Sequence, residues 1–357
     1  MDTRRDYFLT HFQLRNVLAC PSRTEAFYPT QYGIQCYNVM ARTTKSAIRT
    51  TQKSSLTTLA AGYGVLIGGT LNGGYLLKPL DMSSSVNHTE GTITRDPNGL
   101  TCHMELCMPK SSGPQVAIAS NDSYFRIMDL QTEKFVGVSK QKHAINCTAL
   151  GPHRRMRAMV GDWRGVDIYD GETGKKVQEL KGRETDNGFA CAWSEDGWTL
   201  ATASEDRGVR IWDARKWVDS NGKGNPLCIL RSELATARSL HFSPLGSGKP
   251  VLVACEEADY INIIDAQMFS DNQRLDVIGE LGGASFTNEG QDLNVLVCDP
   301  HRGGILQLER TALEAEPAVC RLSRLRPDRE ENMWYPTQGK TKGLRRNWDF
   351  REPLGIF

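Results

Sequence analysis

The segment that decides the fold is ASEDRGVRIWD (residues 203–213), where charged residues sit inside an alternating apolar pattern. Its Ser, Glu, Asp and Arg residues raise the question whether the segment serves chemistry or architecture. Val209 and Ile211 alternate with polar residues, which is the period of a β-strand with one buried face. Asp196-Gly197, a little upstream, indicates a tight turn. Together these features predict a meander of short antiparallel strands.

The same pattern recurs along the chain. Its clearest copies end at Asp129, Asp170, Asp213 and Asp265. The intervals between these ends are 41, 43 and 52 residues, close to the roughly 40 to 45 residues of a four-stranded propeller blade. Weaker copies end near residues 38, 77 and 309. One small sheet cannot bury both of its faces alone, so these units predict an all-β propeller of seven blades.

We expect the propeller to occupy residues 1–309 and an irregular C-terminal extension to occupy residues 310–357. The extension loses strand periodicity and joins basic residues to several aromatic ones. Leaving such side chains in water forgoes roughly 1.5 to 3 kcal/mol each, so the extension should dock somewhere. Two alternatives remain open: it packs on the propeller, whose first blade looks incomplete over residues 13–30, or it anchors a partner.

Trp212-Asp213, preceded by Ser204 and Asp206, resembles the signature of WD-repeat β-propellers, most strongly over residues 180–213. That resemblance implies a hydrogen-bonded tetrad, made of a Gly-His pair, a Ser or Thr, the turn Asp and the Trp, that locks one blade. Ser204, Asp206 and Trp212 match three of these roles. Gly182-Arg183 stands where Gly-His is expected, so the tetrad is predicted to be incomplete.

Earlier units carry partial copies of the tetrad. Ser120 and Asp122 align with the same positions, although Met128 replaces the Trp. His143 is assigned as the turn histidine of the unit that ends at Asp170. An Asp in a strand-connecting turn accepts backbone N–H bonds and needs no substrate to explain it. We therefore interpret Asp206 as architecture.

Two further resemblances concern partners. The pattern from Ser204 to Arg215 is similar to a box in WD-repeat substrate receptors of cullin-RING ubiquitin ligases, whose final Arg contacts the adaptor; this implies a partner-binding role for Arg215. Residues 13–39 and 346–357 resemble a fungal and plant WD-repeat family that includes a substrate receptor of the GID ubiquitin ligase. In that receptor a hydrophobic C-terminus engages the scaffold. The matching residues here are Trp348, Phe350, Ile356 and Phe357.

Composition excludes several classes of protein. The 43 basic and 42 acidic residues give a net charge of +1, so no global field favours nucleic acid or an anionic membrane. No apolar run is long enough to span a bilayer or form a leader, and we expect a soluble protein of the cytoplasm, the nucleus or both. Ten scattered cysteines form no Cys-x-x-Cys pair and are expected to be reduced.

No catalytic, cofactor-binding or metal-binding residues are assigned, and no cofactor is expected. Cys102, His103 and Cys107 come nearest to a ligand cluster, which we interpret as chance proximity. The leading hypothesis is a non-enzymatic protein-interaction scaffold, a monomeric propeller within a complex, with the role of ubiquitin ligase substrate receptor implied by resemblance. The alternatives are a scaffold in transcription or chromatin and a propeller hydrolase that no motif supports.

Overall fold

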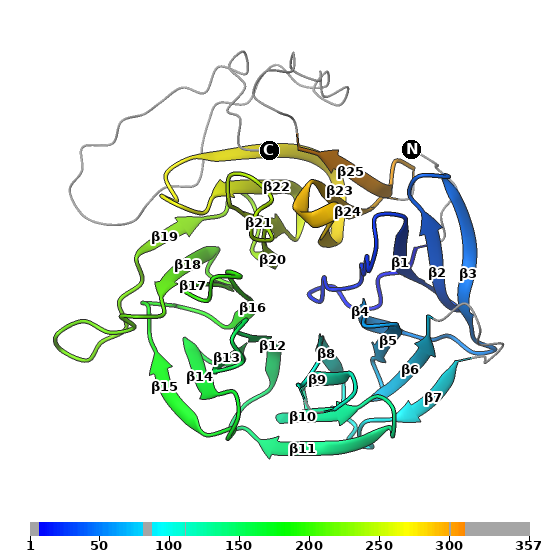
Figure 1. Ribbon diagram of the computed structural model, residues 1–357, viewed down its shortest axis with the longest axis horizontal. Helices are drawn as coiled ribbons and strands as arrows, with labels where there is room; N and C mark the ends of the chain where they lie inside the picture. The colour runs from blue at the N-terminus through cyan, green and yellow to red at the C-terminus, as the bar shows by residue number, and fades with distance from the viewer. Residues whose placement is uncertain (1–6, 81–87, 111, 300, 311–357) are drawn as a thin grey trace, which may run out of the picture.

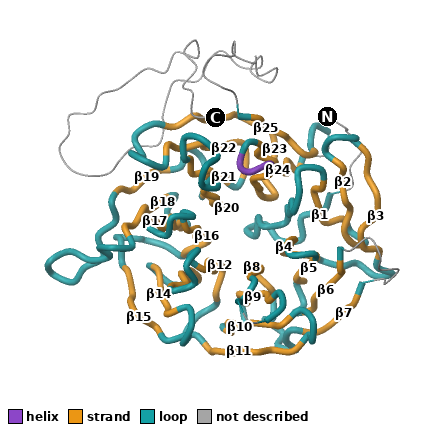
Figure 2. Tube along the Cα trace, viewed as in Figure 1, coloured by secondary structure: helices purple, strands orange, loops and turns teal. Residues whose placement is uncertain are grey.

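Sheets of antiparallel strands are arranged in a ring around a central axis (Figure 1). The computed structural model describes residues 7–80, 88–110, 112–299 and 301–310. Within these ranges the one helical element is a single 3-10 turn, Asn288–Gly290, drawn purple in Figure 2. All other regular structure in the described ranges is β-strand.

The strands form six sheets. The first sheet contains β1 (Glu25–Thr30), β2 (Gly33–Asn38) and β3 (Thr43–Arg49). The second contains β4 (Leu56–Gly62), β5 (Val65–Thr70), β6 (Gly74–Pro79) and β7 (Thr89–Thr92). The third contains β8 (Thr101–Cys107), β9 (Gln115–Ser120), β10 (Tyr124–Asp129) and β11 (Lys134–Lys140). The fourth contains β12 (Ile145–Leu150), β13 (Met156–Gly161), β14 (Val166–Asp170) and β15 (Lys176–Leu180).

The fifth sheet contains β16 (Gly188–Trp193), β17 (Thr199–Ser204), β18 (Gly208–Asp213) and β19 (Cys228–Arg231). The sixth contains β20 (Ala237–Phe242), β21 (Val251–Glu256), β22 (Ala258–Asp265), β23 (Asn272–Thr287), β24 (Asp292–Cys298) and β25 (Gly304–Glu309). Neighbouring strands are consecutive in sequence, so every sheet is a meander. In the second to fifth sheets the first strand lies near the centre of the ring and the fourth at its rim (Figure 1).

The core lies between the sheets rather than inside one layer. Seven clusters of buried apolar side chains occur around the ring. Six of them join two different sheets, as when Val160 of β13 meets Trp212 of β18. The seventh joins the two halves of the sixth sheet, where Val253 of β21 lies in one cluster with Val295 of β24. Each sheet therefore buries its two faces against its neighbours, which is how a propeller gains its hydrophobic stabilisation.

The predicted count of seven blades is corrected to six sheets, and strand β23 is the reason. Residues 272–276 and Glu280 of β23 pair with β22, whereas residues 280–287 pair with β24, so Glu280 has a partner on each side. A single strand of 16 residues thus ends one four-stranded unit and begins the next. Gly279, with φ at +122°, lies at the change of partner and adopts a conformation that other residues rarely reach. The two blade-like halves are therefore joined by hydrogen bonds into one sheet of six strands.

The N-terminal segment closes the ring. The Val17 backbone N–H donates to the Gly282 carbonyl of β23 at 2.9 Å, and the Leu59 N–H of β4 donates to the Asn16 carbonyl at 2.8 Å. Ala19 exchanges two hydrogen bonds with Phe27 of β1. Residues 16–19 therefore form the inner edge of the first sheet. That sheet is thus extended on its inner side by the N-terminal segment, and the predicted docking of residues 311–357 lies outside the described residues.

The residues of the predicted tetrad are arranged around Arg210, which sequence analysis did not assign. Arg210 donates from Nη2 to Asp206 Oδ2 at 2.7 Å and from Nη1 to Ser204 Oγ at 2.7 Å. Its Nε donates to the Gly182 carbonyl at 2.9 Å, so Arg210 takes the place expected for a histidine. Trp212 is fully buried, but its Nε1 donates to Thr202 Oγ1 at 3.0 Å and not to Ser204.

The same device is repeated elsewhere. Arg126 forms two hydrogen bonds with Asp122, while Ser120 donates to the Leu100 carbonyl at 3.2 Å. Asp-x-x-x-Arg spacing thus occurs in the third and fifth sheets and could have been found in the sequence. His143 forms no such brace: it is exposed on the loop between β11 and β12.

In the sixth sheet the fully buried side chain of Glu256 takes the place of the Asp–Arg pair. Its carboxylate accepts three backbone N–H groups from residues 233–235 at 2.8 to 2.9 Å, and a fourth bond from Asn262 at 3.1 Å. Asp206 and Glu256 thus hold the loop that enters from the preceding sheet, whereas in the third sheet Ser120 contacts that loop and Asp122 holds Arg126. This satisfies loop N–H groups that would otherwise be buried without a partner.

Substitution of Asp206 by alanine should destabilise the protein by about 3 kcal/mol, because the buried Arg210 would lose the nearer of its two carboxylates and keep only Glu184, at 3.4 Å. The side chains of Asp206 and Arg210 are 9% and 4% exposed, so water cannot replace the lost partner. Urea denaturation measures the change. The matched control is Asp213→Ala, which breaks an exposed pair with Arg215 and should cost at most about 1 kcal/mol. Equal losses in the two variants would contradict this role.

Stability should also fall at acid pH. Burial raises the pKa of Asp206, but hydrogen bonds from Arg210 and Ser204 outweigh it and hold the pKa well below its ordinary value of 3.8. The ionised carboxylate therefore stabilises the fold above about pH 4, and this contribution is lost as the pH falls further. Urea denaturation between pH 6 and pH 3 should show a shallower acid decline for Asp206→Asn than for the wild type. Parallel curves would refute the assignment.

Candidate functional site

The connections between strands lie on two opposite faces of the ring. Because each strand runs antiparallel to the last, first-to-second and third-to-fourth connections emerge on one face. Second-to-third connections and the links between sheets emerge on the other. We call the face with the first-to-second and third-to-fourth connections the Trp198 face, because Trp198 lies on it. We call the opposite face the groove face, because a cavity opens on it.

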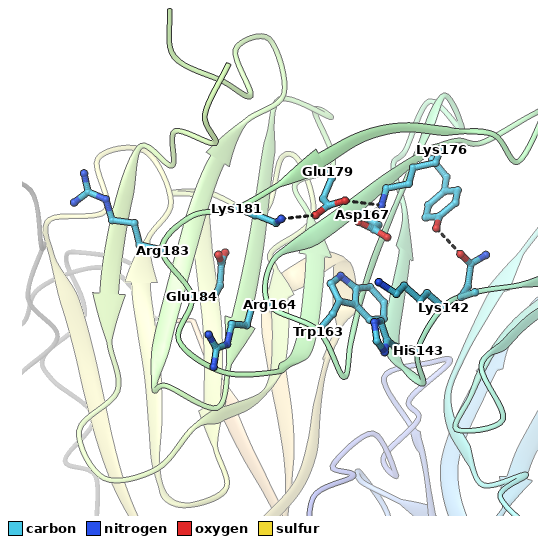
Figure 3. Close-up of a pocket in the computed structure, with 12 residues that line it drawn as sticks. Lys142, His143, Trp163, Arg164, Asp167, Lys176, Glu179, Lys181, Arg183 and Glu184 are labelled. Atoms are coloured by element: carbon cyan, nitrogen blue, oxygen red, sulfur yellow. Dashed lines mark hydrogen bonds and ion pairs between the residues drawn. The ribbon is translucent and has the colours of Figure 1, made fainter. Parts of the chain in front are cut away.

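A cavity of about 670 Å³ opens on the groove face of the fourth sheet (Figure 3). Three loops and two strands surround it: the loops β11–β12, β13–β14 and β15–β16, with β14 and β15. We call it the groove. Its lining residues are Gln141, Lys142, His143, Trp163, Arg164, Asp167, Tyr169, Lys176, Glu179, Lys181, Arg183 and Glu184.

One wall of the groove links two sheets. Tyr169 of β14 donates from its hydroxyl to Gln141 Oε1 at 2.5 Å, across to the loop that follows β11. Burial raises the pKa of Tyr169 to about 12, so the hydroxyl keeps its proton and remains a donor. This wall is therefore fixed by packing and a hydrogen bond before any ligand arrives.

The acids of the groove are already neutralised within the chain. Lys176 Nζ lies 2.8 Å from Asp167 and 3.1 Å from Glu179, and Lys181 lies 2.9 Å from Glu179. Dashed lines in Figure 3 mark the ion pairs of Glu179 with Lys176 and Lys181. Glu184, at the other end, pairs with Arg210 at 3.4 Å and accepts the Gly182 N–H at 2.6 Å. The bracing network of the fifth sheet thus reaches the groove.

A second surface lies on the Trp198 face. Trp198 is 51% exposed, and the Arg215 guanidinium lies over its ring at 5.2 Å from the centroid. Asp213 holds Arg215 in this position with two hydrogen bonds, at 2.9 and 2.8 Å. Leu245, 64% exposed, is tied to the same region because its backbone N–H donates to Glu195 at 2.8 Å. We call these residues the Trp198 surface.

The centre of the ring is nearly filled. A cavity of only about 40 Å³ remains there, lined by the first strands of several sheets and by residues 13–16. Arg15 enters from the N-terminal segment and lies 3.2 Å from Glu280. Arg238 of β20 pairs with Glu205 and Glu257 and stacks on Phe189 at 4.1 Å. Such a channel is too narrow for a ligand, which leaves the loop faces as the candidate binding sites.

The other predicted residues have these positions. Cys102 and His103 line the central cavity, while Cys107 ends β8. The nine cysteines within the described ranges are free thiols. In that part of the chain no cluster of three His, Cys, Asp or Glu side chains could hold a metal ion.

The predicted C-terminal anchor residues Trp348, Phe350, Ile356 and Phe357 lie outside the described residues. None of the helical structure in the described part could cross a membrane.

Comparison with known proteins relates short segments of the chain to WD-repeat proteins. No protein-family model matches it. Over 71 residues it is 37% identical to WD repeat-containing protein 1 of Xenopus tropicalis, which covers 19% of this chain and 12% of that protein. The same protein of Gallus gallus is 31% identical over 102 residues, 28% of this chain and 17% of the relative. A probable cytosolic Fe-S cluster assembly factor of Schizosaccharomyces japonicus is 36% identical over 107 residues, with the same coverage.

The chain therefore spans only 12% to 17% of the length of these relatives. Among solved structures, the WD40 beta propeller domain of Doa1 superposes with a TM-score of 0.64 at 12% identity, covering 83% of this chain and 91% of that one. At that identity the likeness concerns the fold. The ring of meander sheets and the structural likeness show that the chain is an all-β WD40 propeller, and short segments of it are similar in sequence to WD-repeat proteins.

Proposed function

We propose that this chain is a non-enzymatic protein-interaction scaffold that works in the cytoplasm or nucleus as a substrate receptor of a ubiquitin ligase. The observation that carries the proposal is the presentation of Arg215. Its side chain is 63% exposed, yet Asp213 and the Trp198 ring hold it in one position. By resemblance, this arginine is the residue that meets the ligase adaptor.

The side chains of the Trp198 surface contribute little to the free energy of folding and are of the types that anchor protein interfaces. An exposed ion pair such as Arg215–Asp213 contributes at most about 1 kcal/mol to folding. A tryptophan exposed to half of its area forgoes burial that the fold could have used. Trp and Arg are the residues most enriched among the energetic anchors of protein interfaces. Fixing Arg215 in advance also lowers the entropy lost when a partner binds.

The two faces suit a receptor that holds two proteins at once. The Trp198 surface belongs to the loops of the fifth and sixth sheets on one face, and the groove belongs to the opposite face. A partner bound at one face leaves the other open. The residues Trp348, Phe350, Ile356 and Phe357 are proposed as a second anchor, for the ligase scaffold.

Substitution of Arg215 by alanine should lower recovery of the ligase adaptor at least tenfold while leaving the fold intact. Affinity purification of tagged full-length protein, followed by mass spectrometry, measures recovery; thermal unfolding checks the fold. Arg231→Ala is the matched control, since Arg231 is an exposed arginine on β19 of the same sheet. Unchanged recovery of ligase subunits with Arg215→Ala, or their absence with the wild type, would sink the proposal.

Removal of the chain after Arg310 tests the second anchor. We expect the truncated protein to keep the propeller and its thermal unfolding, because the described sheets end with β25 at Glu309. Recovery of the ligase scaffold should fall at least tenfold relative to full length. Identical sets of partners for the two proteins would exclude an anchor in residues 311–357.

A further inference from the structure

The groove carries a positive charge that the protein does not use. Five of its lining residues are Lys or Arg and three are Asp or Glu. The three acids are paired with Lys176, Lys181 and Arg210. Within the described part of the chain, the side chains of Lys142, Arg164 and Arg183 have no hydrogen-bond or ion-pair partner. All three are exposed.

The buried carboxylates of Asp167 and Glu184 do not neutralise the three exposed cations of the groove. Desolvation raises the pKa of Asp167, although Lys176 opposes the shift. Desolvation likewise raises the pKa of Glu184, against the influence of Arg210. Neither carboxylate is free to turn toward the open cations, because each is held by its own partner. The surplus charge is therefore available to a ligand.

Trp163 adds a hydrogen-bond donor that also lacks an acceptor. Its Nε1 is buried and has no partner within the described residues. The ring is fixed from below: a Cβ on Gly161 would lie 2.3 Å from a ring atom, so the indole packs directly on the backbone of β13. Figure 3 draws Trp163 beside Lys142 and His143, with Arg183 and Glu184 toward the other end. Buried donors without partners are rare in native proteins and require an explanation.

We propose that the groove binds an acidic segment of a partner protein, whose carboxylates pair with Lys142, Arg164 and Arg183 and accept the Trp163 N–H. Arginine guanidinium groups bind carboxylates through two parallel hydrogen bonds, which gives such a site specificity as well as charge. A volume of about 670 Å³ is in the range of binding pockets that enclose a ligand. The inference rests on the proposed function, since the segment would belong to the recruited substrate.

A peptide fits this groove better than a nucleic acid does. Grooves that bind single strands present a continuous basic track with several aromatic side chains for base stacking. Here three acids interrupt the basic residues, and Trp163 and Tyr169 are the aromatic residues of the lining, the latter engaged with Gln141. The net charge of the whole chain is +1, which provides no long-range attraction for a polyanion.

The test is fluorescence anisotropy with a labelled peptide that carries six Glu residues spaced by Gly and Ser. We expect saturable binding that weakens as salt increases, and at least tenfold weaker binding of the peptide with Gln in place of Glu. The double variant Arg164→Glu/Arg183→Glu should bind the Glu peptide at least tenfold less tightly than the wild type. Trp163→Phe keeps an aromatic ring but removes the N–H donor and should weaken binding severalfold.

The control is Arg155→Glu, an exposed arginine of the same sheet on the Trp198 face, which should bind the Glu peptide like the wild type. Equal binding of the Glu and Gln peptides would overturn the inference. So would wild-type affinity in Arg164→Glu/Arg183→Glu, or tighter binding of a single-stranded oligonucleotide with six phosphates. These outcomes are separate from the proposed function, because ligase recovery depends on the opposite face and should be unchanged in Arg164→Glu/Arg183→Glu.

Discussion

Each small sheet has two apolar faces, and the described residues contain no helix that covers either face. The rest of the structure depends on stacking these faces against neighbours in a closed ring, because an open row would leave its two ends in water. Closure is made by the N-terminal segment, whose backbone joins β23 to β4 through Asn16 and Val17. The narrow centre follows from this, since residues 13–16 fill space between the innermost strands. The loop faces are consequently the surfaces on which the proposed binding would take place.

Buried acids complete what apolar stacking begins. Asp206, Asp122 and Glu256 each hold polar groups at an inner turn, through different partners. Stacking is non-directional and would tolerate sliding of one sheet on the next, whereas a carboxylate that accepts several defined donors fixes the position of a loop. This division has a functional consequence: the loops that carry Lys181, Arg183 and Glu184 are held by the network around Arg210. The groove is thus shaped by the same contacts that stabilise the fifth sheet.

The charged and aromatic side chains of the Trp198 surface and the groove contribute little to the stability of the fold. Arg215 stacks on an exposed tryptophan, and three groove cations have no counter-charge within the described residues. Neither arrangement adds much to folding, since exposed charges are screened by water. Arg215 is held in place by Asp213 and the Trp198 ring, which would lower the entropy lost in the proposed binding. A scaffold with opposite, independent surfaces can bring two proteins together without any change in its own conformation.

The sequence by itself determined the strands and their repeat: alternation around Val209 and Ile211, and turn signals between runs, are local properties that a reader of the chain can count. The resemblance to WD-repeat signatures also marked Ser204 and Asp206 as members of one hydrogen-bonded set, and Ser204 does donate to Asp206. Tertiary structure alone decided that Arg210 completes their network, that β23 merges two units into one sheet, and that three distant loops form a groove. The physical reason is that these features depend on which groups meet across sheets, and distance between sheets is set by packing rather than by position along the chain.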